Sequence, residues 1–197
     1  MLFRSSKGLL RVALKSTIYR LNLDIADIDN GHYAQHALTL ACHPSETEER
    51  LMVRMLAFAL NAHQIQTLCN GDAHLAYGPG LSNPDEPDLA LTDFSGRIRL
   101  WIEVGQPDER PIVRACGKAD GVRVYAYSHA TDVWWNAIGR KLDRLDHLEV
   151  WRIPDSESTQ LAQMVSRGMS LQATIQDGGV LVGDGNQAVS VAPERLR

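Results

Sequence analysis

The chain is short of the features that mark several protein classes. Its 197 residues include only three cysteines, Cys42, Cys69 and Cys116, which are widely spaced and form no CxxC pair. This pattern argues against a disulfide scaffold or a zinc ribbon and favours reduced thiols in a cytoplasmic protein. No apolar run approaches the roughly 18 residues that a membrane span needs, so we expect no membrane partner.

The chain also has little excess of either charge, because its formal net charge is only −4. A polybasic, coat-like nucleic-acid binder is therefore disfavoured, although a local basic cleft is compatible with this balance. The basic residues Arg140, Lys141 and Arg144 alternate with Asp143 and Asp146, which is typical of a solvated helix face. The sequence thus contains no strong nucleic-acid groove.

Several catalytic motifs are missing. The seven histidines form neither HxH nor HExxH, and the glycine turns at 78–80 and 183–185 match no phosphate-binding loop. Neither Ser45 nor Ser128 lies in a GxSxG elbow. Zinc peptidase, nucleotide-cradling and α/β-hydrolase chemistries are therefore disfavoured.

What is present is a globular composition, with 44% apolar and 22% charged residues. A domain of about 150 residues is typical, so we expect one α/β domain over residues 13–197. Residues 1–12 carry Arg4 and Arg11 among short apolar pieces and lack the continuous apolar core of a secretory signal. They are predicted to be a loose N-terminal extension.

An N-terminal β-hairpin opens the domain. Apolar and polar residues alternate over 16–26 and 32–42 around a turn at 29–31, the pattern of two half-buried strands. A helix should follow to about Asn61, with Ser45 as N-cap and Glu48 completing a capping box. Glu48 should lie at the edge of the inward stripe, whereas Glu46 and Glu49 should point outward; alternatively, Glu48 serves the cap alone.

The remaining pattern gives a mixed α/β layout that closes with a β-hairpin. A long loop is expected over 71–85, and helices are expected over 109–118, 132–142 and 156–166. Strands are expected over 89–104 as a pair, and then over 122–127, 148–153, 169–175, 180–182 and 189–191.

The most informative feature is the strand pair at 89–104. If it turns on Ser95-Gly96 as a two-residue loop, Asp88 lies directly opposite Glu103. The same register pairs Leu89 with Ile102, Ala90 with Trp101, Leu91 with Leu100, and Thr92 with Arg99.

Two carboxylates opposed across strands repel each other unless something neutralises them. Mg²⁺ or Mn²⁺ would do so, because such ions bind one or two carboxylates together with waters and phosphate oxygens. Two other readings stay open: Asp88 only initiates a turn after Pro87, or Glu103 pairs with Arg99 or with an arginine on a helix.

Pro87-Asp88, fourteen intervening residues and then Glu103 resemble the PD-(D/E)XK nuclease signature. More narrowly, the chain resembles the YaeQ family of bacterial proteins over about residues 13–193. The segments that carry this likeness are 14–19, 36–41, 43–47, 86–89, 100–108 and 174–178. The resemblance implies a restriction-endonuclease-like core, in which a mixed sheet is flanked by helices.

The resemblance further implies that Asp88 and Glu103 bind the metal and that Glu48 is an accessory carboxylate. The chain departs from the signature at the lysine position, which is Gly105, followed by Gln106. A cation can reach the same point from the helix at 109–118, where Arg114 and Lys118 share one face, unless both belong to a solvated face. Gln106 could hydrogen-bond the water or phosphate but could not take a proton.

Two hypotheses of function follow. The first is Mg²⁺- or Mn²⁺-dependent phosphodiester hydrolysis of nucleic acid, slowed by about 10²–10⁴-fold for want of the lysine. The second is a catalytically degenerate module that binds nucleic acid or a protein partner. A purely structural role is a third possibility, and it predicts that Asp88→Ala stabilises the fold. The sequence does not reveal the oligomeric state.

Overall fold

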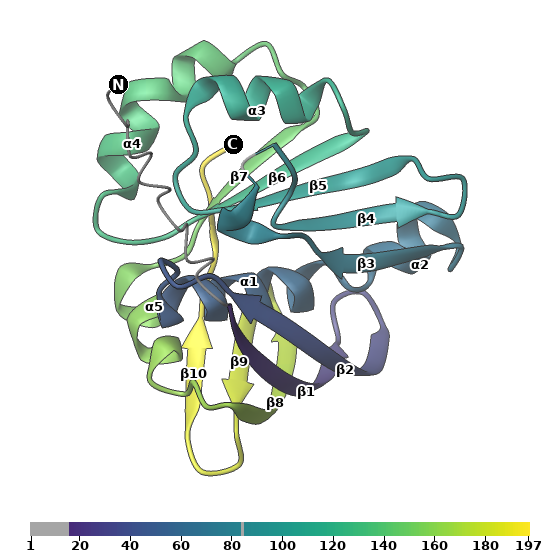
Figure 1. Cartoon of the computed structure of the whole chain (residues 1–197), viewed down its shortest axis with the longest axis vertical. Helices are drawn as coiled ribbons and strands as arrows, with labels where there is room; N and C mark the ends of the chain where they lie inside the picture. Colours follow the sequence, from purple (N-terminus) through teal and green to yellow (C-terminus); the bar gives the residue numbers. More distant parts are fainter. Residues whose placement is uncertain (1–15, 84) are drawn as a thin grey trace, which may run out of the picture.

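The computed structural model describes residues 16–83 and 85–197, and their strands form two mixed sheets with a helix between them (Figure 1). The mixed α/β class expected from the sequence is confirmed, with two sheets in place of one. The predicted extension over residues 1–12 lies outside the described residues.

The first sheet combines the two ends of the domain. Its strand order is β10-β9-β8-β1-β2, and β1 runs parallel to β8 whereas the other neighbours are antiparallel. Both predicted hairpins are therefore confirmed and lie in one sheet. The strands are β1 (Thr17–Asp27), β2 (His32–Cys42), β8 (Gly168–Gln176), β9 (Gly179–Gly183) and β10 (Ala188–Val191).

The second sheet has the order β11-β7-β6-β5-β4-β3, with β5, β6 and β7 parallel. The strands are β3 (Ala73–Tyr77), β4 (Leu89–Asp93), β5 (Ile98–Val104), β6 (Gly121–Ala126), β7 (Leu148–Arg152) and β11 (Glu194–Arg195). The expected loop over 71–85 was wrong in part, because it contains the edge strand β3 and the 3₁₀ turn η1 (Gly80–Ser82). The turn-forming residues around β3 hid its short alternation, in which Ala73 and Leu75 are buried.

The helix α1 (Glu48–Asn61) is the central element. Its residues from Leu51 to Ala59 are all buried, and all of them except Arg54 are apolar. The predicted apolar stripe is therefore buried, and burial extends beyond it because the helix is covered on both sides. It lies between the two sheets (Figure 1), and the larger apolar cluster joins it to the facing sides of both. The helix α5 (Asp155–Ala162) packs beside it.

The other helices cover the outer side of the second sheet. A separate apolar cluster packs residues of β5, β6 and β7 against them. They are α3 (Glu109–Cys116), α4 (Thr131–Ile138) and the 3₁₀ turn η2 (Gly139–Leu142), while the short α2 (Gln64–Cys69) follows α1. None of the helices within the described ranges is long and apolar enough to cross a membrane.

One end of α1 differs from the expectation. The N-cap is Thr47, whose Oγ1 accepts a hydrogen bond from the Arg50 backbone N–H at 3.1 Å. The predicted cap, Ser45, lies in the preceding turn, where its N–H donates to Nδ1 of His43. This shift of two residues changes which glutamate faces inward.

Candidate functional site

The predicted hairpin register is confirmed where it matters for the site. Leu89 pairs with Ile102, Ala90 with Trp101 and Leu91 with Leu100. The predicted pair of Thr92 with Arg99 was wrong, because an irregularity after Leu91 brings Thr92 opposite Ile98. The turn is longer than two residues, and the irregularity absorbs the difference before the register reaches Asp88 and Glu103.

Asp88 lies at the start of β4 and is 2% exposed. Its N–H donates to the Ile102 carbonyl at 3.0 Å, and its Oδ2 accepts from the Val104 N–H at 2.8 Å. These backbone bonds fix the carboxylate against β5. Asp88 therefore does more than initiate a turn.

The partner of Asp88 is Arg50, on the first turns of α1. Nη2 of Arg50 donates to Oδ1 and Oδ2 of Asp88, each at 2.7 Å, and to the Val104 carbonyl at 3.2 Å. Burial alone would lower the pKa of Arg50, but the carboxylates of Asp88 and Glu46 outweigh it and raise the pKa. The arginine is thus a fixed positive charge at this site.

Glu46 holds the other side of the same arginine. Its Oε1 accepts from Nη1 of Arg50 at 2.9 Å and from Nη1 of Arg54 at 3.1 Å, and its side chain is 1% exposed. The expectation that Glu46 points outward was wrong, because the helix begins at Thr47 and the turn before it directs Glu46 inward. Glu48 is exposed and does not line the cavity described below, so the structure does not bring the proposed accessory carboxylate to the site.

Glu103 lies beside Asp88 on the neighbouring strand, and both line one cavity of about 450 Å³. Burial raises the pKa of Glu103 to about 7, and repulsion from Asp88 adds to the shift. Its Oε1 accepts a 2.6 Å hydrogen bond from Nε1 of Trp101, in place of the arginine that the sequence suggested. Glu103 therefore keeps its proton to a higher pH than an ordinary glutamate does.

Gln106 lines the same cavity. Its Nε2 donates to the Tyr127 carbonyl at 2.9 Å and to the hydroxyls of Ser128 and Thr131, each at 3.1 Å. The amide nitrogen is thus committed to the protein, and Oε1 is the atom left to accept a hydrogen bond. This agrees with the role predicted for Gln106 but does not test it.

The predicted cations Arg114 and Lys118 lie on the other side of Glu103, and only Arg114 belongs to α3, because the helix ends at Cys116. Nη1 of Arg114 pairs with Oδ1 of Asp85 at 2.6 Å, and Nζ of Lys118 donates to the Asp85 carbonyl at 3.2 Å. Both line a small hollow that shares Glu103 with the cavity, but neither lines the cavity itself. In the described part of the chain, the basic residue that lines the cavity is Arg50.

The donor types around Asp88 suit a hard cation, because two carboxylates and the Val104 carbonyl are oxygen ligands. Within residues 16–83 and 85–197, however, no three His, Cys, Asp or Glu side chains cluster as a metal site. Nη2 of Arg50 contacts three oxygens of this set. A metal would therefore have to share the site with Arg50 or displace it.

Arg50 is the residue that sequence reasoning missed. The available signal was its position four residues after Glu46, which places the two on one side of a turn. Nothing in the local pattern links Arg50 to Asp88, because that contact forms only when α1 packs against the second sheet.

The fold and the site define an α/β protein with two mixed sheets, in which a buried aspartate and a half-buried glutamate lie near an arginine of the helix between the sheets. The chain belongs to the YaeQ family: a family model described as "YaeQ protein" matches residues 12–193. A Salmonella typhi protein described as "Uncharacterized protein YaeQ" is 41% identical over 181 residues, covering 91% of this chain and 95% of that one.

Two crystal structures of YaeQ proteins have the same fold. The protein from Xanthomonas axonopodis pv. citri is 40% identical with a TM-score of 0.83, and the match covers 92% of this chain and 98% of that one. The protein from Pseudomonas syringae is 32% identical with a TM-score of 0.83, covering 92% and 96%. The family predicted from the sequence is thereby confirmed.

Proposed function

We propose that the cavity is a divalent-cation-dependent site for phosphodiester hydrolysis in nucleic acid, built on a nuclease-like core with Asp88 and Glu103 as metal-binding carboxylates. The observation that carries this proposal is the convergence of the two carboxylates in one cavity, where the pKa of Glu103 rises to about 7. A cation that stabilises both ionised acids relieves the repulsion. Mg²⁺ and Mn²⁺ accept such a ligand set, completed by waters and phosphate oxygens.

The acidic lining of the cavity means that an anionic substrate can bind there only together with a cation. Three acids, Glu86, Asp88 and Glu103, line it with one base, Arg50. A phosphodiester entering this cavity is repelled unless further positive charge accompanies it. Nucleic acid as substrate therefore requires the cation in this proposal.

The chain's own residues have distinct tasks. Asp88 and Glu103 would hold the ion, and Glu103 would give up its proton as the ion binds. Gln106 would accept a hydrogen bond from the attacking water through Oε1 and orient it. Bound there, a divalent ion supplies a water of lowered pKa and stabilises charge on the phosphate. Among the described residues no lysine lines this cavity, so we expect slow turnover.

The contact between Arg50 and Asp88 favours a second candidate function. In this alternative the arginine neutralises Asp88 permanently, and the cavity binds nucleic acid or a protein partner without hydrolysis. The two candidates differ in whether the protein binds a divalent ion with the aid of both carboxylates.

The deciding experiment combines binding with turnover. Calorimetric titration with Mn²⁺ is paired with cleavage assays on single-stranded DNA, duplex DNA and RNA, using wild type, Glu103→Gln and Asp24→Asn. Asp24 is an exposed acid on β1 of the first sheet, so its variant loses one negative charge away from the site. The proposal expects Mn²⁺ binding and cleavage in wild type and Asp24→Asn, and loss of both in Glu103→Gln. Cleavage that survives in Glu103→Gln, or a wild type that binds no Mn²⁺, overturns it.

A further inference from the structure

Two basic segments run side by side on the outer side of the second sheet. Nζ of Lys141 lies 3.3 Å from Oε2 of Glu109, at the start of α3. Nε2 of His147 lies 2.9 Å from the Cys116 carbonyl, at the end of α3. The segment 139–147 therefore follows α3 along its whole length.

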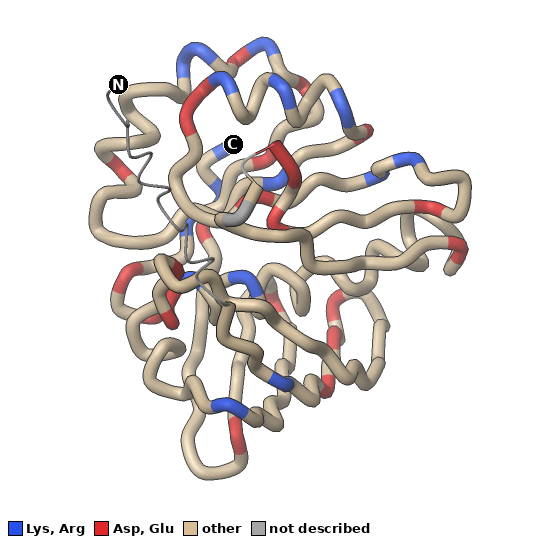
Figure 2. Tube along the Cα trace, in the orientation of Figure 1, with Lys and Arg blue, Asp and Glu red and all other residues tan. Residues whose placement is uncertain are grey.

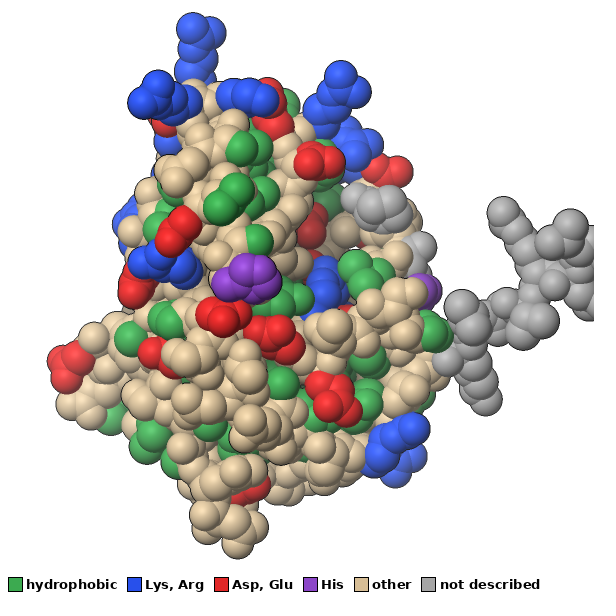
Figure 3. Space-filling view, turned by 90° about the vertical axis from the view of Figure 1, so that its left-hand side faces the viewer, with side chains coloured by type: hydrophobic (Ala, Val, Ile, Leu, Met, Phe, Trp, Pro, Cys, Tyr) green, Lys and Arg blue, Asp and Glu red, His purple; other side chains and the backbone are tan. Residues whose placement is uncertain are grey.

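This arrangement gathers positive charge that is dispersed in the sequence. Six exposed basic residues form what we call the basic ridge: Arg110, Arg114, Lys118, Arg140, Lys141 and Arg144. The same two segments contain three acids, Glu109, Asp143 and Asp146, in a chain whose net charge is −4. Lys and Arg gather over α3 and its neighbour in Figure 2, and their side chains project from the top of the molecule in Figure 3.

Two of the three acids are already paired. Glu109 contacts Lys141, and Asp143 lies 3.6 Å from Nη1 of Arg197 at the chain's end. Within the described residues no ion pair with a carboxylate is formed by Arg110, Arg140 or Arg144. These charges are free to meet an anionic partner.

The ridge ends at the candidate site. Nζ of Lys118 lies 5.4 Å from the centre of the Trp101 ring, and Nε1 of Trp101 donates to Glu103. Arg114 and Lys118 line the small hollow that Glu103 also lines. The ridge therefore extends to Glu103, one of the two carboxylates of the candidate site.

We propose that the basic ridge binds the sugar-phosphate backbone of a nucleic-acid strand and guides it to Glu103. The choice of nucleic acid over another polyanion rests on the proposed function. The eight residues of α3 extend over about 12 Å, which is comparable with three to four base-pair steps of about 3.4 Å along the axis of a duplex. An acidic protein is the competing occupant, and the test below separates the two.

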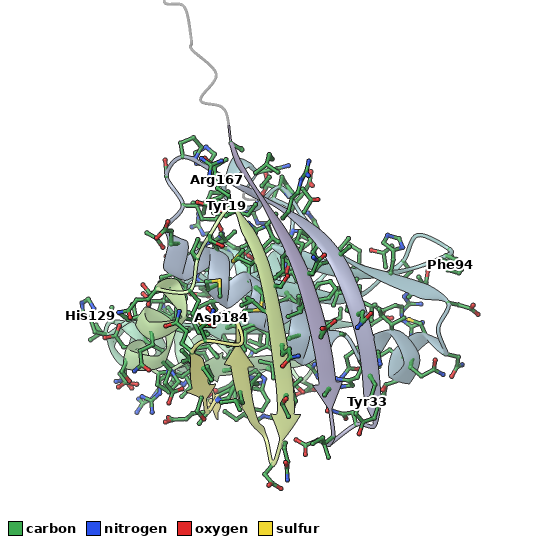
Figure 4. The ribbon with its side chains drawn as sticks, turned by 90° about the horizontal axis from the view of Figure 1, so that it is seen from below. Tyr19, Tyr33, Phe94, His129, Arg167 and Asp184 are labelled. Carbon is green, nitrogen blue, oxygen red and sulfur yellow. The ribbon has the colours of Figure 1, made fainter. Side chains whose placement is uncertain are left out.

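The test neutralises matched pairs of arginines. Arg140→Gln/Arg144→Gln alters the ridge, whereas Arg20→Gln/Arg167→Gln alters exposed arginines at the first sheet, where Figure 4 labels Arg167 beside Tyr19. Both double variants change the net charge equally. Binding of fluorescein-labelled single-stranded and duplex DNA is followed by anisotropy over a salt series without divalent metal.

The slope of the logarithm of the DNA association constant K against log[salt] measures the number of phosphates that the protein contacts. Losing two contacts reduces it by about 1.4 for a single strand and about 1.8 for a duplex, so affinity at 0.1 M salt falls by about 25- to 60-fold relative to a common value at 1 M. The control pair should keep the wild-type slope. The proposal is overturned if both double variants lose DNA affinity equally or if the ridge pair loses none. It is also overturned if wild type binds no DNA, and that result favours an acidic protein as the partner.

Failure of the ridge is separable from failure of the proposed function. If wild type binds DNA through the ridge but cleaves nothing with Mn²⁺, the proposal for the ridge is supported and the proposed hydrolytic function is wrong. If wild type cleaves and the ridge pair binds and cleaves as well as wild type, only the ridge falls.

Discussion

Nη2 of Arg50 lies 2.7 Å from both carboxylate oxygens of Asp88, and the two residues come from different layers of the fold. Arg50 belongs to the helix between the sheets, and Asp88 to the start of a strand in the second sheet. The contact explains how a 2% exposed carboxylate is tolerated without a metal, because a buried charge needs a partner and hydrogen bonds. It also places Arg50 on the oxygens of Asp88 and Val104 that a metal ion would use.

Replacing Asp88 is expected to destabilise the protein. Asp88→Ala removes one of the two carboxylates that pair with Arg50, whose side chain is 11% exposed, and leaves Glu46 as the other. Breaking a buried pair costs up to about 3–5 kcal/mol. Urea unfolding followed by circular dichroism measures this loss against Asp24→Asn, which should stay within about 0.5 kcal/mol of wild type. A variant more stable than wild type would support the purely structural role considered from the sequence.

Removing the charge of Arg50 is expected to raise the affinity of the site for a divalent metal ion. Arg50→Met removes the cation nearest the oxygens of Asp88 and Val104 and leaves Nε of Arg54 at 3.9 Å from Oδ1 of Asp88. We expect Mn²⁺ to bind this variant roughly tenfold more tightly, or about 1.4 kcal/mol. Electron paramagnetic resonance of free Mn²⁺ gives the affinity independently of activity. Arg97→Met, which removes a 67% exposed arginine at the far end of the hairpin, is the control. Unchanged affinity in Arg50→Met contradicts competition between the arginine and the ion.

The raised pKa of Glu103 predicts how stability depends on pH. The folded protein holds the Glu103 proton up to about pH 7, whereas the unfolded chain releases it near 4.5. Between these values the folded state binds more protons, so stability falls as pH rises and levels off above 7. The loss is at most about 3 kcal/mol.

Glu103→Gln cannot ionise and should lack this loss. Its melting temperature should therefore exceed that of wild type at pH 8 and approach it at pH 5. Mg²⁺ should raise the melting temperature of wild type above pH 7, where Glu103 is ionised, and should leave Glu103→Gln unchanged. Parallel pH profiles for the two proteins contradict the assignment.

The sequence correctly predicted the helices, strands and pairings that depend on residues close together in the chain. The alternation in β1 and β2, the apolar stripe of α1 and the pairing of Leu89 with Ile102 each depend on residues close in the chain, and each is confirmed. The sequence did not reveal that β1 pairs with β8, because no local pattern encodes a contact over about 150 residues. For the same reason it missed the separation of the strands into two sheets, whereas the edge strand β3 was missed because turn-forming residues surround it.

In the candidate site, too, the features that depend on local sequence could be predicted and those that depend on packing could not. The approach of Asp88 to Glu103 followed from one hairpin register and could be predicted. The inward glutamate could not, because a shift of the helix start from Ser45 to Thr47 exchanges Glu48 for Glu46. The contact of Arg50 with Asp88, and the basic ridge, depend on packing between layers, which the sequence leaves open.

The corrected helix start is directly testable. Thr47 accepts the Arg50 N–H, so Thr47→Ala should lower the free energy of unfolding by about 1 kcal/mol. Ser45 caps no helical N–H, so Ser45→Ala should change stability by less than about 0.5 kcal/mol. Chemical unfolding of both variants decides between the two caps, and a larger loss in Ser45→Ala restores the original expectation.

The backbone at Gly105 does not readily accept the lysine that the nuclease signature has at this position. This residue has φ of +109°, a conformation that other residues avoid, although a Cβ there would meet only Cε1 of Tyr127 at 4.0 Å. Gly105→Ala and Gly105→Lys should therefore lose about 1–3 kcal/mol of stability each, through backbone strain rather than a clash. Gly168→Ala is the matched control, since a Cβ there meets nothing within 4 Å and the backbone lacks the positive φ. Equal stability of Gly105→Ala and Gly168→Ala would remove the conformational explanation, and glycine at this position would then need a functional reason of its own.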